Sequence, residues 1–321
     1  MQAVVVRDYG PPEQYAVAEL PVPRPGPGQL LVRVAAASIN PGDVVIPSGR
    51  FRDAAPLTFP HVPGNDFAGT VAEVGPAVRG YVPGDEIFGY AAPRALRPML
   101  GPRPSMSTGS LAQYTVVEAD TPFVTHRPAG LTAEQAAALA TTGLAARAVL
   151  ATAGIRPGER VLVVGATGGV GTTLLPLLAA ARATVVATAT EHDADLVRDL
   201  GATEVVGYDE RGYPEGVDAA FNLTLPSDRL TGVARAVRPG GRLLTITYPV
   251  PRQDWIGRDD VDLRFVLDME GALGGMREVA DLATNGPLRA TIGRRYTLGE
   301  GAQACVDFER RHTTGKLVVV M

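Results

Sequence analysis

The stretch that decides the fold is Val161-Leu162-Val163-Val164-Gly165-Ala166-Thr167-Gly168-Gly169-Val170-Gly171. Its first part is a short, β-branched apolar run without helical spacing, which is typical of a strand buried on both faces. The glycines let the backbone turn tightly and approach an anion. The helix expected from Thr172 to Ala181 would offer that anion its free N–H groups and the positive end of its dipole. A second apolar strand, Thr184–Ala189, follows at the distance that a βαβ unit requires.

This pattern matches the dinucleotide fingerprint, with Ala166 in place of the first glycine. The alternative is a glycine-rich turn with a purely structural purpose, and the complete strand–turn–helix–strand context favours the fingerprint. We predict that Thr167, Gly168, Gly169, Val170 and Gly171 contact the bound dinucleotide.

Composition narrows the class of protein. The 321 residues suggest two domains or one large one, and 45% hydrophobic with 20% charged residues is ordinary for a soluble globular protein. The formal net charge of -4 gives no reason to expect nucleic acid or an anionic membrane as a partner. No apolar run is expected to reach the length of a transmembrane helix. Because the chain opens on a strand-like segment without an evident signal peptide, we expect a cytoplasmic protein.

Cysteine and histidine usage argues against a metal centre. Cys305 is the only cysteine, so an intrachain disulfide and a multi-cysteine zinc site are excluded. The four histidines are scattered without ligand spacing. We therefore expect no bound metal.

The first part of the chain is rich in short strands and turns, which predicts a β-barrel-like domain. Helical periodicity begins at Thr132, where Thr132 and Gln135 resemble a capping box. An alanine-rich helix is expected to about Thr141, continued from Leu144 to Ala153. The strands expected in the first part are Met1–Arg7, Gln29–Ala36, Phe67–Val74 and Gln113–Glu118.

From Val161 onward, strands and helices alternate, which predicts an α/β fold with a doubly wound parallel sheet. The last expected strand, 316–320, would return to the first domain. We therefore expect one domain over residues 1–122, completed by 290–321, and a second over 123–289. The expected strands are 161–164, 184–189, 204–206, 217–222 and 242–247, and the expected helices are 172–181, 193–200, 228–237 and 274–284.

The segment 91–108 holds four prolines among three arginines and is expected to be a long loop. A surface excursion is the favoured interpretation. The alternative is a lid over a substrate site, because long loops in compact domains are often functional.

Several segments together resemble the medium-chain dehydrogenase/reductase superfamily, and within it the zinc-free quinone oxidoreductase (zeta-crystallin-like) and enoyl reductase branch. The resemblance implies a GroES-like β-barrel domain built from both chain ends, a Rossmann domain, and a cofactor in the cleft between them. Relatives are commonly homodimers. The segments that carry it are Ala36–Asp43, Pro63–Gly69, Gly109–Tyr114, Gly165–Gly171 and Gly315–Val318.

The resemblance also bears on zinc. Zinc-bearing members of the superfamily have a cysteine ligand where this chain has Asn40, and a histidine ligand where it has Asn65. Amides are poor zinc ligands. This agrees with the cysteine count, and we expect neither catalytic nor structural zinc.

Cofactor choice is expected at the end of the second Rossmann strand, where an NAD site has a carboxylate for the ribose 2′-OH. Thr188 and Thr190 place hydroxyls there instead, and Tyr208 matches a family tyrosine that contacts the 2′-phosphate of NADPH. The threonines could also reflect plain β-propensity. Glu191 could supply a carboxylate after a one-residue shift, and Ala194 stands about where many relatives have a lysine. We predict NADPH over NADH.

Further site residues follow from the resemblance. Thr142 matches a position near the nicotinamide, and Lys316, the only lysine, falls where relatives have a basic residue near the pyrophosphate. Asn40 and Asp43 lie in the segment that faces the nicotinamide in relatives. Asn40 could bind the carboxamide or a substrate carbonyl, and Asp43 could equally be a turn or cap residue. Tyr248 is a candidate proton donor.

One departure concerns the proton. Relatives often have a tyrosine in the segment aligned with Val44-Val45-Ile46, and here the run is apolar. Tyr248 and Tyr90 are possible substitutes, and water is a third source. The apolar run suggests a small hydrophobic substrate.

We expect hydride transfer from NADPH to a quinone or to the β-carbon of an α,β-unsaturated carbonyl, with bacterial polyketide or secondary metabolism as a possible setting. The alternatives are carbonyl reduction to an alcohol and dinucleotide binding without turnover.

Overall fold

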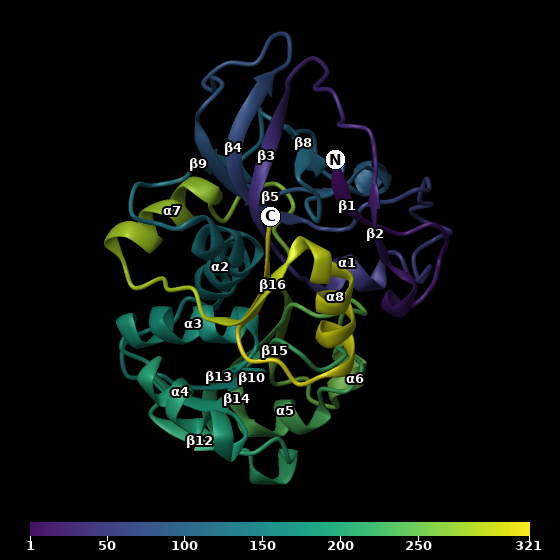
Figure 1. Ribbon diagram of the computed structural model, residues 1–321. Coiled ribbons are helices and arrows are strands. Elements are labelled where there is room, and N and C mark those ends of the chain that lie inside the picture. The colour runs from purple at the N-terminus through teal and green to yellow at the C-terminus, as the bar shows by residue number, and fades with distance from the viewer. The chain divides into compact units, whose positions relative to one another are not determined.

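A computed structural model describes residues 1–321, except for the side chain of Met99. The chain forms two compact units, and three separate segments build the first of them (Figure 1). Unit 1 comprises Met1–Thr141, Met269–Asn285 and Ile292–Met321, and unit 2 comprises Thr142–Asp268 and Gly286–Thr291.

Unit 2 is built on a parallel sheet whose strand order is β12-β11-β10-β13-β14-β15. In chain order this reads 3-2-1-4-5-6, which is the doubly wound Rossmann topology. The sequence predicted β12 and β13 with their observed bounds but missed β15 at the edge. The strands are β10 (Arg160–Val164), β11 (Thr184–Thr188), β12 (Glu204–Val206), β13 (Val217–Asn222), β14 (Val237–Thr245) and β15 (Asp262–Phe265).

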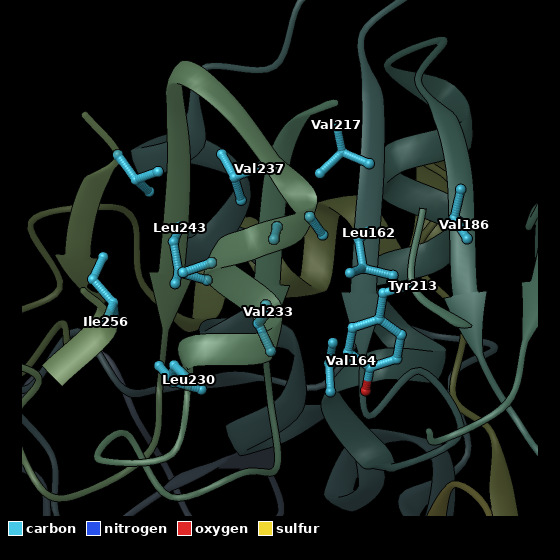
Figure 2. Packing of buried hydrophobic residues seen from close by; sticks show 14 residues of the cluster. Leu162, Val164, Val186, Tyr213, Val217, Leu230, Val233, Val237, Leu243 and Ile256 are labelled. Atoms are coloured by element: carbon cyan, nitrogen blue, oxygen red, sulfur yellow. The ribbon is translucent and has the colours of Figure 1, made fainter. Parts of the chain in front are cut away.

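One hydrophobic cluster fills a face of this sheet. Figure 2 shows Leu162 of β10 and Leu243 of β14 packed with Val233 of α5 (Thr231–Ala236). These side chains are fully buried, and burying each stabilises the fold by about 1.5–3 kcal/mol. The β-branched run of the fingerprint is therefore a core strand, as expected. The other helices of this unit are α3 (Gly169–Ala180), α4 (Ala194–Asp199) and α6 (Gln253–Ile256), with short 3-10 helices η3 (Glu191–Asp193) and η4 (Glu210–Gly212).

Unit 1 contains the GroES-like part of the fold. Its main sheet has the order β6-β7-β8-β3-β4-β5-β9, and β1 pairs with β2 separately. The C-terminal strand β17 pairs antiparallel with β3 and parallel with β16, so the end of the chain returns to the first domain as predicted. The strands are β1 (Gln2–Val5), β2 (Ala16–Glu19), β3 (Gln29–Ser38), β4 (Asp66–Val74), β5 (Glu86–Tyr90), β6 (Ala92–Pro93), β7 (Met106–Ser107), β8 (Tyr114–Glu118), β9 (Val124–His126), β16 (Ile292–Thr297) and β17 (Lys316–Val320).

Two elements lie in unit 1 although their residues fall within the range 123–289 expected for the Rossmann domain. Strand β9 pairs antiparallel with β5, which fixes it to the barrel sheet. Helix α7 (Met276–Asn285) contacts β9. Pairing partners far away in the sequence thus decide the domain boundary. The other helices of this unit are α1 (Pro41–Val45) and α8 (Gly301–Arg310), with 3-10 helices η1 (Pro12–Gln14), η2 (Arg94–Met99) and η5 (Leu298–Glu300).

Helix α2 (Ala133–Ala153) is continuous and passes from one unit into the other. The capping box at its start is present, because Thr132 N donates to Gln135 Oε1 at 3.0 Å and Gln135 N donates to Thr132 Oγ1 at 3.2 Å. Within the described chain, α2 is the helix long and apolar enough to cross a membrane by length and composition, and most of it is buried. The expectation that no segment reaches that length was wrong, because the Thr141-Thr142-Gly143 interruption does not end the helix.

The segment 91–108 is anchored to the barrel at both ends. Ala92 N donates to Ser105 O at 2.8 Å, β6 pairs with β7, and β7 pairs with β8. Between these anchors the chain forms η2. The segment is therefore a structured excursion from the sheet, as favoured, and a lid function has no support from these contacts.

Candidate functional site

The fingerprint turn lies at the carboxyl end of β10, where the order of the sheet reverses. Doubly wound sheets bind their ligands outside the carboxyl ends of the strands at this point. Gly165 has φ +87°, which favours glycine, and its N–H donates to the Thr188 hydroxyl at 3.0 Å. Helix α3 then begins at Gly169, so its first N–H groups, which have no partner within the helix, open on the turn.

Gly168 and Gly171 of the turn differ in what the protein requires at each position. A Cβ on Gly171 would lie 2.5 Å from Ala166 O and also collide with Gly165 O, so only glycine lets α3 pack against the turn. At Gly168 the nearest atom to a built Cβ is Gly165 O at 3.6 Å, an ordinary contact. The protein itself leaves room for a side chain at Gly168. That space is what a pyrophosphate approaching the backbone would fill.

Thr188 and Thr190 both have hydrogen-bond partners within the protein. Thr188 is fully buried, and its hydroxyl accepts from the Gly165 N–H and so supports the turn. The Thr190 hydroxyl caps η3, because it donates to Asp193 Oδ2 at 2.8 Å and accepts from Asp193 N at 3.3 Å. Both hydroxyls therefore form hydrogen bonds within the local structure. The alternative considered from the sequence, plain β-propensity, does not include such bonds.

Tyr208 and Thr167 meet, although 41 residues separate them. Their hydroxyl oxygens are 3.4 Å apart, and Tyr208 is 47% exposed while Thr167 is buried. The predicted 2′-phosphate tyrosine thus stands directly beside the fingerprint turn. Glu191 is exposed on η3, at the end of β11.

A buried polar cluster, which sequence reasoning missed, organises the loops after β13 and β14. Asn222 Nδ2 donates to Thr245 Oγ1 at 2.9 Å and to Thr247 Oγ1 at 3.0 Å, and Asn222 Oδ1 accepts from Leu225 N at 2.9 Å. Ser227 Oγ lies 3.0 Å from Thr245 Oγ1. Asn222 pairs across the sheet with Val164, so the cluster fixes the backbone at the same carboxyl edge as the turn. The sequence did contain a signal for this cluster, because Asn222 and Thr245 are polar residues at the ends of two neighbouring strands, β13 and β14.

Three other predicted residues have clear surroundings. Thr142 is buried in α2. Tyr248 is 50% exposed, with its ring edge-on to Phe265 at a centroid distance of 5.3 Å. Tyr90 belongs to unit 1 and packs edge-on against Phe123.

Unit 1 contains a second polar feature, centred on the fully buried carboxylate of Asp66. One oxygen, Oδ2, accepts from Ser38 Oγ at 2.7 Å and from Asn40 Nδ2 at 2.8 Å, and lies 3.5 Å from Lys316 Nζ. The other, Oδ1, accepts from Thr141 N at 3.1 Å and from Thr141 Oγ1 at 2.5 Å. We call these five residues the Asp66 network. It joins β3, β4, α2 and β17.

Lys316, predicted near the pyrophosphate, has its partners inside unit 1. Its ammonium donates to Ile39 O at 2.6 Å and to Asn40 Oδ1 at 2.7 Å, and it faces Asp66 at 3.5 Å. The side chain is 7% exposed, and burial lowers the pKa of the ammonium. The ammonium thus donates two hydrogen bonds and faces a carboxylate inside the unit, which makes Lys316 part of the buried structure of unit 1.

Asn40 and Asp43 hold the turn into α1. Both ends of the Asn40 amide have partners in the Asp66 network: Nδ2 donates to Asp66 and Oδ1 accepts from Lys316. The predicted contact of Asn40 with a carboxamide or a substrate carbonyl would have to compete with these bonds. Asp43 accepts from Asn40 N at 2.8 Å and from Gly64 N at 3.0 Å. Burial raises the pKa of Asp43 to about 7, while these two N–H groups oppose the rise. The cap alternative for Asp43 fits these contacts.

The apolar run after Asp43 also has a structural purpose. Val44 and Ile46 are buried, and Val44 packs in the same hydrophobic cluster as Leu317 and Val319. The run therefore builds the core of unit 1, and it gives no information on substrate polarity.

No metal centre is evident in the described part of the chain, where no group of three or more His, Cys, Asp or Glu side chains could hold an ion. Asn40, at one of the two former ligand positions, is committed to Lys316 and Asp66. The Lys316 ammonium thus occupies the place beside Asn40 and Asp66 that a metal cation would need. Zinc independence itself stays a prediction.

Comparison with known proteins identifies the family. Residues 26–128 match the alcohol dehydrogenase GroES-like domain family, and residues 193–319 match the zinc-binding dehydrogenase family. The chain belongs to the medium-chain dehydrogenase/reductase superfamily, and its relatives include proteins named quinone oxidoreductase and alkenal/one oxidoreductase.

Three similar proteins illustrate the range of the family. The chain is 29% identical to the chloroplastic quinone-oxidoreductase QR1 of Triphysaria versicolor, over 94% of this chain and 92% of the relative. It is 29% identical to the chloroplastic NADPH-dependent alkenal/one oxidoreductase of Arabidopsis thaliana, over 99% and 79%. A solved structure titled NAD-dependent alcohol dehydrogenase is 30% identical over the full length of both chains, with a TM-score of 0.83.

The first prediction separates the two glycines. Gly168→Ala should leave the melting temperature nearly unchanged and weaken NADPH binding by about tenfold or more, because its Cβ takes up ligand space and not protein space. Gly171→Ala should lower the melting temperature, because its Cβ collides with the turn. Thermal unfolding and fluorescence titration measure the two effects. Unchanged NADPH affinity in folded Gly168→Ala would show that the turn is not a pyrophosphate site.

The second prediction concerns the buried cation. Lys316→Met leaves the Asp66 carboxylate buried without its counter-charge, which should cost about 3 kcal/mol or more of unfolding free energy. Arg310→Met is the matched control, since its ion pair with Glu13 is exposed and should matter little. Denaturant unfolding compares the two variants. Equal, small losses would show that the Asp66 network does not stabilise the unit.

Proposed function

We propose that this protein is an NADPH-dependent oxidoreductase that reduces a quinone or the activated double bond of an α,β-unsaturated carbonyl. The observation that carries the proposal is the fingerprint turn with free space at Gly168 and the helix α3 N-terminus behind it. Two relatives named for quinone and alkenal/one reduction support the acceptor class.

The reaction would be balanced by one hydride and one proton. NADPH supplies the hydride to the β-carbon of the acceptor, a proton adds to the α-carbon, and NADP⁺ and the saturated ketone are the products. The chain's contribution is to bind and orient the dinucleotide and the acceptor, which is the usual division of work in such enzymes. We assign the proton to water, because the chain has the apolar run Val44-Val45-Ile46 where relatives often have a tyrosine.

NADPH is supported over NADH by Tyr208 rather than by the threonines. Its hydroxyl stands beside Thr167 at the turn, where it can donate to a 2′-phosphate. Charge-assisted hydrogen bonds of this kind are the stronger ones. The relative named as NADPH-dependent points the same way, whereas the solved structure is titled NAD-dependent. The choice of NADPH over NADH therefore rests on the position of Tyr208 beside the turn.

The third prediction tests cofactor choice. NADPH should bind about tenfold more tightly than NADH, and Tyr208→Phe should narrow that difference by weakening NADPH alone, since a hydrogen bond to a charged group contributes about 1.5–3 kcal/mol. Fluorescence titration of both dinucleotides against both proteins measures it, and the NADH affinity serves as the internal control. Tighter NADH binding by the unmodified protein would refute the choice and point to Glu191 as the ribose ligand.

The fourth prediction concerns zinc. Oxidation of NADPH with menadione or benzylideneacetone should persist after dialysis against a chelator, and elemental analysis should find no stoichiometric zinc. The reasons are the amides at positions 40 and 65 and the engagement of Asn40 by Lys316. One tightly held zinc per chain, with activity lost on its removal, would contradict this. Cytoplasmic location and a homodimer also stay predictions of the sequence.

A further inference from the structure

Thr224 is an exposed threonine directly beside the fingerprint turn. A Cβ built on Gly165 would lie 3.0 Å from both Cβ and Cγ2 of Thr224, so the methyl side of this threonine rests on the turn. In the part of the chain that the structure describes, the Thr224 hydroxyl has no hydrogen-bond partner. Thr224 therefore presents a free hydroxyl at the carboxyl edge of the sheet.

Three neighbouring threonines differ from Thr224, because their hydroxyls are engaged within the protein. Thr188 Oγ1 accepts from the Gly165 N–H at 3.0 Å. Thr245 Oγ1 and Thr247 Oγ1 accept from the Asn222 amide at 2.9 Å and 3.0 Å. A free, exposed hydroxyl at the edge where doubly wound sheets bind their ligands is suited to contact the ligand.

The backbone on both sides of Thr224 is held in place. Leu223 N donates to Val164 O at 3.0 Å, which ties the segment to the last residue of β10. Leu225 N donates to Asn222 Oδ1 at 2.9 Å, and Leu225 O accepts from Asn222 Nδ2 at 2.7 Å. The Thr224 hydroxyl is therefore carried on a fixed main chain, as a preorganised binding group requires.

The strand order indicates which half of a dinucleotide reaches Thr224. Strands β11 and β13 flank β10 on opposite sides. A doubly wound sheet binds one mononucleotide with each of its halves, and the pyrophosphate lies at the turn between them. The adenosine ribose belongs at the end of β11, so the nicotinamide ribose falls at the end of β13. Thr224 follows that strand by two residues.

We propose that the Thr224 hydroxyl forms a hydrogen bond with a ribose hydroxyl in the nicotinamide half of NADPH. This rests on the proposed function. A threonine hydroxyl both donates and accepts, as a ribose hydroxyl does, so the two groups are complementary. Because Thr224 also packs on Gly165, the contact fixes the ribose relative to the pyrophosphate site. The residues that carry the proposal all belong to unit 2.

Two variants at this position separate the hydroxyl from the methyl group. Thr224→Val replaces the hydroxyl with a methyl group of similar size and keeps the packing on Gly165, whereas Thr224→Ser keeps the hydroxyl alone. Thr184→Val is the matched control, since Thr184 is exposed at the opposite end of the sheet, where β11 begins. Adenosine 2′,5′-bisphosphate is the matched ligand, because it lacks the nicotinamide half of NADPH.

Calorimetric titration of each protein with both ligands gives the test. Thr224→Val should weaken NADPH binding by about fivefold, which is what one neutral hydrogen bond typically contributes. Its affinity for the bisphosphate should be unchanged, and its melting temperature should hold, because the removed hydroxyl has no partner in the described chain. Thr224→Ser and Thr184→Val should match the unmodified protein with both ligands.

Three results would overturn the proposal. NADPH affinity of Thr224→Val within about twofold of the unmodified protein would show that the hydroxyl makes no such bond. Equal weakening of NADPH and the bisphosphate would assign Thr224 to the adenosine half. A loss in Thr224→Ser as large as in Thr224→Val would show that only the methyl packing matters.

Failure of the proposed function has a different signature. An unmodified protein that binds neither NADPH nor NADH would contradict the proposed function and this inference together. If the unmodified protein binds NADPH but reduces neither enone nor quinone, only the proposed reaction fails. The titrations need no acceptor, so they still decide the assignment of Thr224 in that case.

Discussion

The carboxylate of Asp66 is the constraint on which the first unit depends. It is fully buried and accepts hydrogen bonds from Ser38, Asn40 and Thr141 while facing Lys316. A buried charge of this kind is costly unless paired and hydrogen-bonded, and its most distant partner, Lys316, lies 250 residues from Asp66 in the sequence. Satisfying one carboxylate therefore brings the C-terminal strand, the helix α2 and the turn into α1 to the same place.

In the glycine turn of the second unit, one glycine is needed for packing and another leaves room for a ligand. Gly171 is required by packing, because α3 lies against the turn, whereas Gly168 is not. Thr188 supports the turn from the neighbouring strand, and Asn222 fixes the loop on its other side. Hydrogen bonds from both neighbouring strands thus hold the carboxyl edge of the sheet, and Gly168 leaves room at the turn for a side chain or a ligand. A rigid site of this type orients a cofactor at little entropic cost on binding.

Local patterns in the sequence were enough for the fingerprint, for β13 and for the return of β17 to the barrel, because apolar runs and glycines act within a few residues. The hydrogen-bond partners of Thr188, Thr190 and Lys316 within the protein could not be predicted from such local patterns, and the assignment of these residues to the cofactor stays a prediction. Residues 165 and 39–40 are those partners for Thr188 and Lys316, and no spacing rule connects them. For Thr190 the partner is close, but the short helix η3 that it caps lies just before the expected helix and was not predicted. The domain boundary was misplaced for a similar reason, since β9 pairs with β5.

The most direct test of the whole account is the fate of the hydride. NADPH with deuterium at both C4 positions is incubated with benzylideneacetone and the protein, and the product is analysed by NMR. The account predicts one deuterium at the β-carbon of the saturated ketone for each NADPH consumed. Deuterium at the carbonyl carbon of an allylic alcohol would establish carbonyl reduction and contradict the account, and unlabelled starting material with intact NADPH would contradict turnover altogether.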